Sequence, residues 1–457
     1  MSDNGSLFND DDLFGSSEPV VRETRQSEPE SAPYAARYSN SRIKPISLDG
    51  LNPMQREAAE HVNGPLLVVA GAGSGKTRVL THRIAHLISN HGVSPMNVLA
   101  ITFTNKAAGE MKHRVESLIG PVAKSMWVST FHSACVRILR VHAERIGYPK
   151  TFSIYDQADA QRLTGYVIRD MGLDVKRFTP RAVHAVISNW KNELVSPAQA
   201  AEQAAHIFDR KHSEIYREYQ ERLLKAGAMD FDDLLVNVVR LFRMHADVLA
   251  SYQDRFKYIM VDEYQDTNIA QNEIVLSLSA RHQNVCVVGD TDQSIYAFRG
   301  ADFRNIGQFE NAFDEVSVVL LEQNYRSTQN ILDAANAVIA QNFGRKPKEL
   351  WTETGPGDAI VRFHAEDEGD EAAFVARTMQ TLRTGGRKWG DMAVFYRTNP
   401  QSRVVEEIFM RFGVPYKVVG GTRFYDRREI KDAVAYLRVI TNPLDEVSVK
   451  RVLNMPK

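Results

Sequence analysis

A short glycine-rich loop most constrains what this chain can fold into. It reads Gly71-Ala72-Gly73-Ser74-Gly75-Lys76-Thr77, follows an apolar run at residues 66–69 and precedes a helical pattern at residues 76–88. Small residues let backbone N–H groups close around an anion, and the start of a helix adds a favourable partial charge there. The strand–loop–helix order therefore predicts a phosphate-binding loop, with Ala70 where the general pattern has its first glycine.

The last two residues of the loop carry its expected chemistry. Lys76 should reach the β- and γ-phosphates of ATP, and Thr77 should bind Mg²⁺ through its hydroxyl. The alternative is a glycine turn without a ligand. The position of the lysine–threonine pair at the start of a helix argues against that alternative.

An acidic pair, Asp262 and Glu263, follows another apolar run at residues 258–261. α/β proteins bind ligands at the carboxyl ends of their strands. We expect Asp262 to hold the Mg²⁺ shell and Glu263 to orient and deprotonate an attacking water. The second carboxylate favours hydrolysis over the chemistry of a P-loop kinase.

A third apolar run, at residues 285–288, precedes a polar turn. Gln293 in this turn could contact the γ-phosphate. The alternative is a turn with a capping Asp.

Composition excludes several classes of protein. The chain has 457 residues, enough for several domains, and 43% of them are hydrophobic. Its net charge of −1 neither supports nor excludes nucleic-acid binding. Cys135 and Cys286 lie in apolar contexts and are predicted to be core thiols, which fits a reducing compartment. We find neither an apolar run of about 18 residues nor a secretory signal, so we expect a cytoplasmic protein without membrane contact.

The distribution of apolar runs predicts the organisation of the chain. Residues 1–46 are rich in Ser, Pro, Asp and Glu and are expected to be disordered, with order beginning at Leu51. Strand-like runs alternating with helical patterns indicate a doubly wound, mostly parallel α/β sheet. The strands are expected at residues 66–69, 98–103, 258–261 and 285–288, and a helix is expected to begin near Lys106. A second α/β unit is expected to begin near residues 318–321, with strands at 360–363 and 392–396.

Seven segments in a fixed order carry a resemblance to a known family. The chain resembles the superfamily 1 DNA helicases of the UvrD/PcrA/Rep type from about residue 48 to its end. The segments are Leu51-Asn-Pro-Met-Gln55, Ala70 to Thr77, Thr102-Phe-Thr-Asn-Lys106, Ser129-Thr-Phe-His132, Val261 to Asn268, Gly289 to Gly300 and Gln323-Asn-Tyr-Arg326.

The resemblance implies an α/β fold with two RecA-like P-loop domains and helical insertions, incomplete at its C-terminal end. The expected divisions are a tail at 1–46, the first RecA-like domain at 47–131 and 257–322, a helical insertion at 132–256, part of the second RecA-like domain at 323–419, and the start of a second insertion at 420–457.

The resemblance also implies roles around ATP. Gln55 would read the adenine edge, while Arg78 and Tyr325 would stack on the base. Arg326 would act as the arginine finger that neutralises charge on the γ-phosphate, an effect of about 10³–10⁵ in rate in related reactions. A packing aromatic is the alternative for Tyr325, and a surface salt bridge is the alternative for Arg326.

Single-stranded DNA contacts are implied as well, by aromatic stacking over a basic groove. Phe298 stands where the family usually has tryptophan, so stacking there should persist but weaken. Core packing is the alternative for Phe103 and Phe131. The candidates are Thr102, Phe103, Thr104, Asn105, Lys106, Phe131, His132, Tyr296, Phe298 and Arg299.

One acidic segment resembles the family without an assigned role. Asp230 and Asp232 invite interpretation as a metal site. A helix cap with a solvated acidic face is the preferred interpretation.

The resemblance implies a 3′–5′ DNA helicase or translocase in DNA repair or replication restart, acting on single strands and single-strand/duplex junctions, with repair or transcription proteins as further partners. A DNA-stimulated ATPase that displaces proteins without processive unwinding is one alternative. The helicase part of a recombination helicase–nuclease is another.

Family members continue beyond the equivalent of residue 457 and return there to the second α/β domain. We therefore expect a fragment of a longer polypeptide, which binds ATP but hydrolyses it and unwinds DNA poorly alone. Unwinding of a tailed duplex by residues 1–457 at the rate of a complete relative would contradict this expectation.

Overall fold

The computed structural model describes residues 43–296, 300–302, 304–342, 347–419, 428–453 and 455. These residues divide into two compact units. The sheet unit contains the described residues up to Gly357 and from Asp432 onward, and the small unit contains those between Asp358 and Lys431. No helix in the described ranges combines the length and apolar character needed to cross a membrane.

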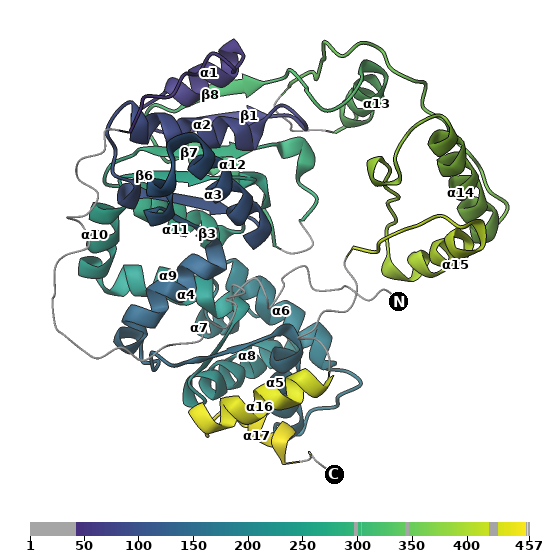
Figure 1. Ribbon diagram of the computed structural model, residues 1–457. Helices are drawn as coiled ribbons and strands as arrows, with labels where there is room; N and C mark the ends of the chain where they lie inside the picture. Colours follow the sequence, from purple (N-terminus) through teal and green to yellow (C-terminus); the bar gives the residue numbers. More distant parts are fainter. Residues whose placement is uncertain are drawn as a thin grey trace, which may run out of the picture. The chain divides into compact units, whose positions relative to one another are not determined.

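A six-stranded parallel sheet organises the sheet unit, in the order β3-β2-β6-β7-β1-β8 (Figure 1). β1, β2 and β7 are buried along their whole length, which explains why their sequences are continuous apolar runs. The four strands predicted for the first α/β unit are confirmed within one residue. The strands are β1 (Leu66–Ala70), β2 (Val98–Thr102), β3 (Trp127–Thr130), β6 (Tyr258–Val261), β7 (Val285–Gly289) and β8 (Ser317–Leu321).

Helices cover both faces of this sheet. Residues that alternate along each strand contribute to two separate cores. One core lies under α1 (Pro53–Glu60), α2 (Lys76–Ser89) and α3 (Asn105–Ile119). The other lies under α4 (Phe131–His142), α9 (Phe231–Met244), α11 (Ile269–Ser279) and α12 (Asn305–Asn311). Cys135 and Cys286 are buried free thiols, one in each core, as predicted.

The edge strand β8 corrects one expectation. Residues 318–321 were expected near the start of a second α/β unit, but β8 pairs with β1 and belongs to the first sheet. The compact units separate after Gly357. The assignment of residues 323–419 to a second RecA-like domain stays a prediction. Helix α13 (Gln329–Ile339) also lies in the sheet unit.

The region between β3 and β6 is mainly helical, as expected. Its helices begin after N-cap residues such as Asp156, Thr179 and Ser196, whose side chains accept hydrogen bonds from the first turn. Two short strands were not expected: β4 (Ser153–Tyr155) and β5 (Ala228–Asp230) pair in parallel. At three residues each, they are too short to give a visible alternation in the sequence. The remaining helices are α5 (Gln157–Asp170), α6 (Pro180–Asn192), α7 (Pro197–Glu202), α8 (Ile207–Lys225) and α10 (Ala246–Arg255).

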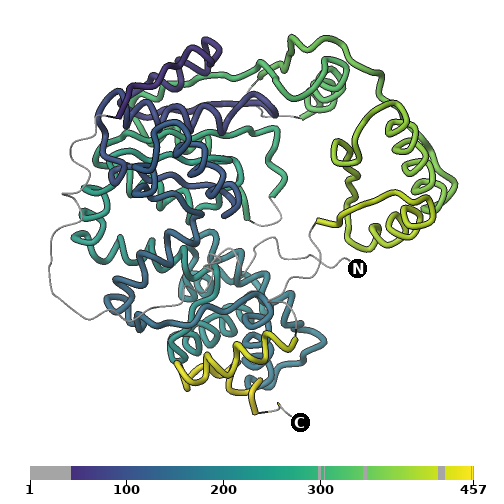
Figure 2. The backbone as a smooth tube through the Cα atoms, viewed as in Figure 1, coloured from purple at the N-terminus to yellow at the C-terminus, as the bar shows by residue number. Residues whose placement is uncertain are grey.

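The last described residues pack on this helical region. α16 (Arg428–Thr441) and α17 (Glu446–Val452), yellow in Figure 2, confirm the helical character expected of this segment. Asp445 accepts a 2.6 Å hydrogen bond from the Tyr155 hydroxyl, and Arg438 pairs with Asp159 at 2.9 Å.

Short 3₁₀ helices complete the described elements: η3 (Pro95–Asn97), η4 (Pro121–Ser125), η5 (Ala143–Ile146), η6 (Tyr264–Asp266), η7 (Thr291–Gln293), η9 (Trp389–Asp391) and η10 (Asn399–Gln401).

The small unit differs from expectation. Its helices α14 (Glu368–Thr384) and α15 (Ser402–Phe412) pack around Phe409. Residues 360–363 and 392–396 were expected to be strands, and neither is. A strand needs a hydrogen-bonded neighbour, and neither segment has one within the described residues. Ile360, Val361 and Phe363 are exposed instead, and Phe395 is 93% accessible, while Val394 packs against the Phe409 cluster.

The start of the described chain also departs from expectation. Order was expected from Leu51, yet Ile46 already donates a 3.0 Å backbone hydrogen bond to Asn90, and Leu48 is buried. The prediction of disorder for the preceding tail falls on residues 1–42, which lie outside the described residues.

Candidate nucleotide-binding and nucleic-acid site

The glycine-rich loop joins β1 to α2, as the sequence predicts. Gly73 and Gly75 both have positive φ, 69° and 89°, a conformation that favours glycine. Gly75 is the N-cap of the 14-residue helix α2. The Ser74 hydroxyl donates to the Gly71 carbonyl at 2.8 Å, which closes the turn. The loop has the backbone geometry that anion binding at a helix start requires.

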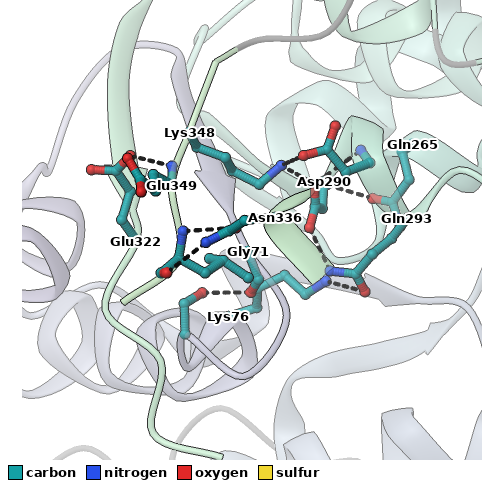
Figure 3. Close-up of polar contacts among 12 residues, drawn as sticks. Gly71, Lys76, Gln265, Asp290, Gln293, Glu322, Asn336, Lys348 and Glu349 are labelled. Atoms are coloured by element: carbon teal, nitrogen blue, oxygen red, sulfur yellow. Dashed lines mark hydrogen bonds and ion pairs between the residues drawn. The ribbon is translucent and has the colours of Figure 1, made fainter. Parts of the chain in front are cut away.

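Lys76 faces the residues that follow β6 and β7. Its ammonium lies 2.9 Å from Glu263 Oε2. It also lies 3.3 Å from Gln293 Oε1 (Figure 3). Glu263 has a left-handed backbone, φ 51°, unusual for a residue other than glycine and typical of strained functional positions. The structure thus brings together three residues that sequence placed in one site.

Asp262 and Thr77 form the pair expected to bind Mg²⁺. The Thr77 hydroxyl donates to Asp262 Oδ2 at 3.4 Å. Burial, and next the charge of Glu263, raise the pKa of Asp262 to about 6. A hydroxyl and a buried carboxylate that lacks full charge compensation suit a hard cation with oxygen ligands. These two residues would hold Mg²⁺, which would supply charge neutralisation at bound phosphates.

The raised pKa of Asp262 predicts a gain in stability on substitution. Between pH 3.8 and about 6 the folded chain retains a proton that the unfolded chain has lost, so stability decreases as the pH rises through this window. Asp262→Asn should therefore raise the free energy of unfolding at pH 7, without Mg²⁺ or nucleotide, by about 1–3 kcal/mol. Denaturant titration measures this gain, which should be smaller at pH 5. A variant no more stable than wild type at pH 7 would show that the pKa of Asp262 is not raised in the folded chain.

Two residues without a predicted role connect these groups. Gln265 donates to Glu263 Oε2 at 2.9 Å and accepts from the backbone N–H of Asp290, also at 2.9 Å. Asp290 Oδ2 in turn accepts from the Gln293 amide. Gln265 and Asp290 lie inside two of the quoted segments, and that position was the only sequence signal for them.

The residues expected to hold the base lie beside the loop. Gln55 is buried: its amide donates to the Ser74 carbonyl at 2.8 Å and its oxygen accepts from the backbone of Asn52. Arg78 donates to the Gly50 carbonyl at 2.7 Å. The Tyr325 hydroxyl accepts from Asn52 at 2.8 Å, and its side chain is half exposed. Their contacts with adenine stay a prediction.

The segment that carries Arg326 crosses directly over the loop. Asn324, also missed in the sequence, donates to the Ala72 carbonyl at 2.6 Å, and the Tyr325 backbone donates to Gly73. A Cβ on Gly73 would lie 2.8 Å from Arg326 Cβ. Asn324 Oδ1 accepts from the backbone N–H of Arg326 at 2.7 Å, and Arg326 itself is exposed. The geometry brings Arg326 next to the phosphate loop.

The DNA candidates separate into surface and core residues. Phe103 and Tyr296, which follow β2 and β7, contact each other with ring centroids 5.1 Å apart, and both are partly exposed. Lys106 is exposed at the start of α3, and Asn105 beside it accepts from Ser133 at 3.4 Å. Phe298 and Arg299 lie outside the described residues.

Three other candidates are buried. The Thr102 hydroxyl donates to the Thr104 carbonyl at 3.0 Å, so it faces its own turn rather than solvent. Phe131 packs in the core under α4 and α9, and the packing alternative describes it in this structure. Burial lowers the pKa of His132 to about 4, so it is neutral at pH 7 and offers no charge to a phosphate. All three side chains are buried in this structure, and their contacts with DNA stay a prediction.

The acidic segment 230–233 is a helix cap, but it is not solvated. Asp230 caps α9 and forms a capping box with Asp233. Both carboxylates are buried and pair with Lys191 at 2.7 and 2.8 Å. The expected solvated face is therefore wrong for Asp230, which shares one buried lysine with Asp233, while Asp232 is half-buried.

A parallel sheet with a glycine loop after β1, an acidic pair after β6 and a polar turn after β7 defines a P-loop α/β fold. The UvrD/REP helicase N-terminal domain matches residues 51–314, and the UvrD-like helicase C-terminal domain matches residues 319–457. The chain belongs to the UvrD/REP helicase family.

Individual relatives agree with this membership. The ATP-dependent DNA helicase PcrA of Bacillus subtilis is 53% identical over 411 residues, which are 90% of this chain and 56% of that protein. The ATP-dependent DNA helicase UvrD1 of Mycobacterium tuberculosis is 54% identical over 422 residues, 90% of this chain and 55% of the relative. The chain thus spans little more than half the length of these relatives.

Proposed function

We propose that this chain is the ATP-binding part of a 3′–5′ DNA helicase or translocase, which couples ATP hydrolysis to movement on single-stranded DNA and to duplex unwinding. One observation carries the proposal. The short segment after β7 contacts Lys76 of the phosphate loop through Gln293 and, three residues later, contacts Phe103 through Tyr296. Loss of a γ-phosphate beside Gln293 would therefore move an aromatic pair suited to stacking on bases.

The chain's own residues suggest how hydrolysis proceeds. Lys76 would leave Glu263 for the phosphates of ATP, since phosphate oxygens compete for the same ammonium. Glu263, still held by Gln265, would then be available to accept a proton from water. Arg326 would stabilise the charge that develops on the γ-phosphate. The names of the relatives support this reaction, and DNA repair or replication restart in the cytoplasm is its proposed setting.

Phe103 offers a direct test of the DNA surface. Phe103→Ala should weaken binding of fluorescent oligo(dT) by about 1–3 kcal/mol, because one stacked base loses its platform. Fluorescence anisotropy at fixed salt measures the affinity, and ATP binding should stay unchanged.

Phe131→Ala is the matched control for this test. Phe131 is buried in the core, so its truncation should lower the melting temperature rather than change DNA affinity selectively. Equal DNA affinity for Phe103→Ala and wild type would count against the proposed surface.

A further inference from the structure

A buried lysine outside every predicted motif contacts the turn after β7. Lys348 has a side chain only 3% exposed, and its ammonium forms ion pairs with Asp290, at 2.5 Å, and with Asp292 (Figure 3). The two aspartates lie 58 and 56 residues away in sequence. Burying three charges is costly unless they are paired, so this arrangement calls for a reason.

The segment that carries Lys348 is anchored by other contacts. Asn336 of α13 donates to the Leu350 carbonyl at 2.9 Å and accepts from the Leu350 N–H at 3.2 Å. Trp351 continues the pairing next to β8 through the backbone of Asn324, at 2.7 Å. Leu350 also packs against the phosphate loop so closely that a Cβ on Gly71 would lie 2.1 Å from its Cδ2. The position of this segment therefore does not depend on the ion pairs.

The two carboxylate oxygens of Asp290 accept hydrogen bonds from different side chains: one from Lys348 and the other from Gln293, the residue predicted to contact the γ-phosphate. Oδ1 accepts from Lys348 and from the backbone N–H of Asp292, while Oδ2 accepts from the Gln293 amide at 2.5 Å. The Gln293 oxygen is thereby turned toward Lys76. Without the ammonium, two neighbouring carboxylates would repel each other in a partly buried turn, and that turn fixes the orientation of Gln293.

We infer that Lys348 is a positioning residue for Gln293: its buried ammonium holds Asp290 and Asp292 together, so that the Gln293 amide faces the phosphate loop. The inference rests on the proposed function, because it assumes that Gln293 senses the γ-phosphate. Since Leu350 and Trp351 tie the same segment to the loop and to Asn324, Lys348 also links the turn after β7 to the segment that carries Arg326.

The test is the preference of the 457-residue chain for a nucleoside triphosphate over a diphosphate. ATPγS and ADP are titrated, each with Mg²⁺, by calorimetry or by displacement of a fluorescent nucleotide. Lys348→Met should weaken ATPγS binding about tenfold and leave ADP binding within about twofold, as expected for loss of one hydrogen bond to a charged group. Lys348→Arg, which keeps the charge, should retain most of the preference. Lys124→Met removes an exposed lysine and serves as the matched control.

A combined variant separates positioning from general damage. In the Gln293→Ala background, Lys348→Met should cause no further loss of ATPγS affinity, because its effect acts through Gln293. Additive losses, an equal loss for ATPγS and ADP, or an equal loss in the Arg and Met variants would each overturn the inference. If Lys348→Met does not fold, Asp290→Asn, which removes the charge that joins Lys348 to the Gln293 amide, should reduce the triphosphate preference in the same direction, and an unchanged preference there would overturn the inference. A wild-type chain that binds neither nucleotide would instead refute the proposed function.

Discussion

Replacing Glu263 with glutamine is expected to preserve ATP binding and to reduce turnover by about 10²–10⁴-fold. Glu263 lies two residues after the end of β6 in a strained conformation, and its carboxylate is the only group in the predicted site assigned to remove a proton from water. Glutamine has the same size and can still accept the hydrogen bonds from Lys76 and Gln265, but it cannot take up a proton. The nucleotide-free arrangement should therefore survive.

Single-turnover hydrolysis of radiolabelled ATP, with protein in excess and single-stranded DNA present, measures this effect even where the chain alone hydrolyses slowly. Glu273→Gln on α11 is the matched control, since Glu273 pairs with Arg243 at the surface. It should keep the wild-type rate. Survival of turnover in Glu263→Gln would show that the water-activating role is wrong.

Arg326→Ala is expected to reduce the rate of hydrolysis by about 10³–10⁵-fold, with a much smaller effect on ATP affinity. The structure supports this expectation over the salt-bridge alternative. Within the part of the chain that the structure describes, the Arg326 guanidinium has no ion pair or hydrogen bond, while its Cβ lies against Gly73. A guanidinium next to the phosphate loop can act when charge develops on the γ-phosphate.

Arg326→Lys distinguishes the two effects of a cation there. Lysine keeps one positive charge but loses the planar, two-pronged geometry, so partial recovery of the rate is expected. Rates and nucleotide affinities are measured in parallel. A loss of affinity as large as the loss of rate would place Arg326 in ground-state binding rather than in the transition state.

Local sequence patterns predicted the central sheet well. β1, β2, β6 and β7 are buried on both faces, so each forms a continuous apolar run that needs no knowledge of its neighbours. The small unit was less predictable, because residues 360–363 have a strand-like composition but lack a paired neighbour within the described residues. The pairing of β8 with β1 is a long-range contact, and no local pattern reports it.

In the candidate site too, residues in local motifs were predictable and residues placed by long-range contacts were not. Lys76, Glu263 and Gln293 lie in quoted motifs, and the structure brings them together. Lys348 escaped notice because its two partners are distant in sequence and a single lysine carries no pattern. Phe131 was ambiguous because an aromatic residue at a helix start can face either solvent or core, and only the packed structure shows which.

The most direct test of the whole account is ATP hydrolysis by this chain with and without single-stranded DNA. Because Gln293 and Tyr296 lie on one short segment between the phosphate loop and the aromatic pair, we predict that oligo(dT) accelerates hydrolysis and that Glu263→Gln abolishes the response. A chain that binds ATP and binds DNA, yet hydrolyses ATP at the same rate with and without DNA, would contradict the account.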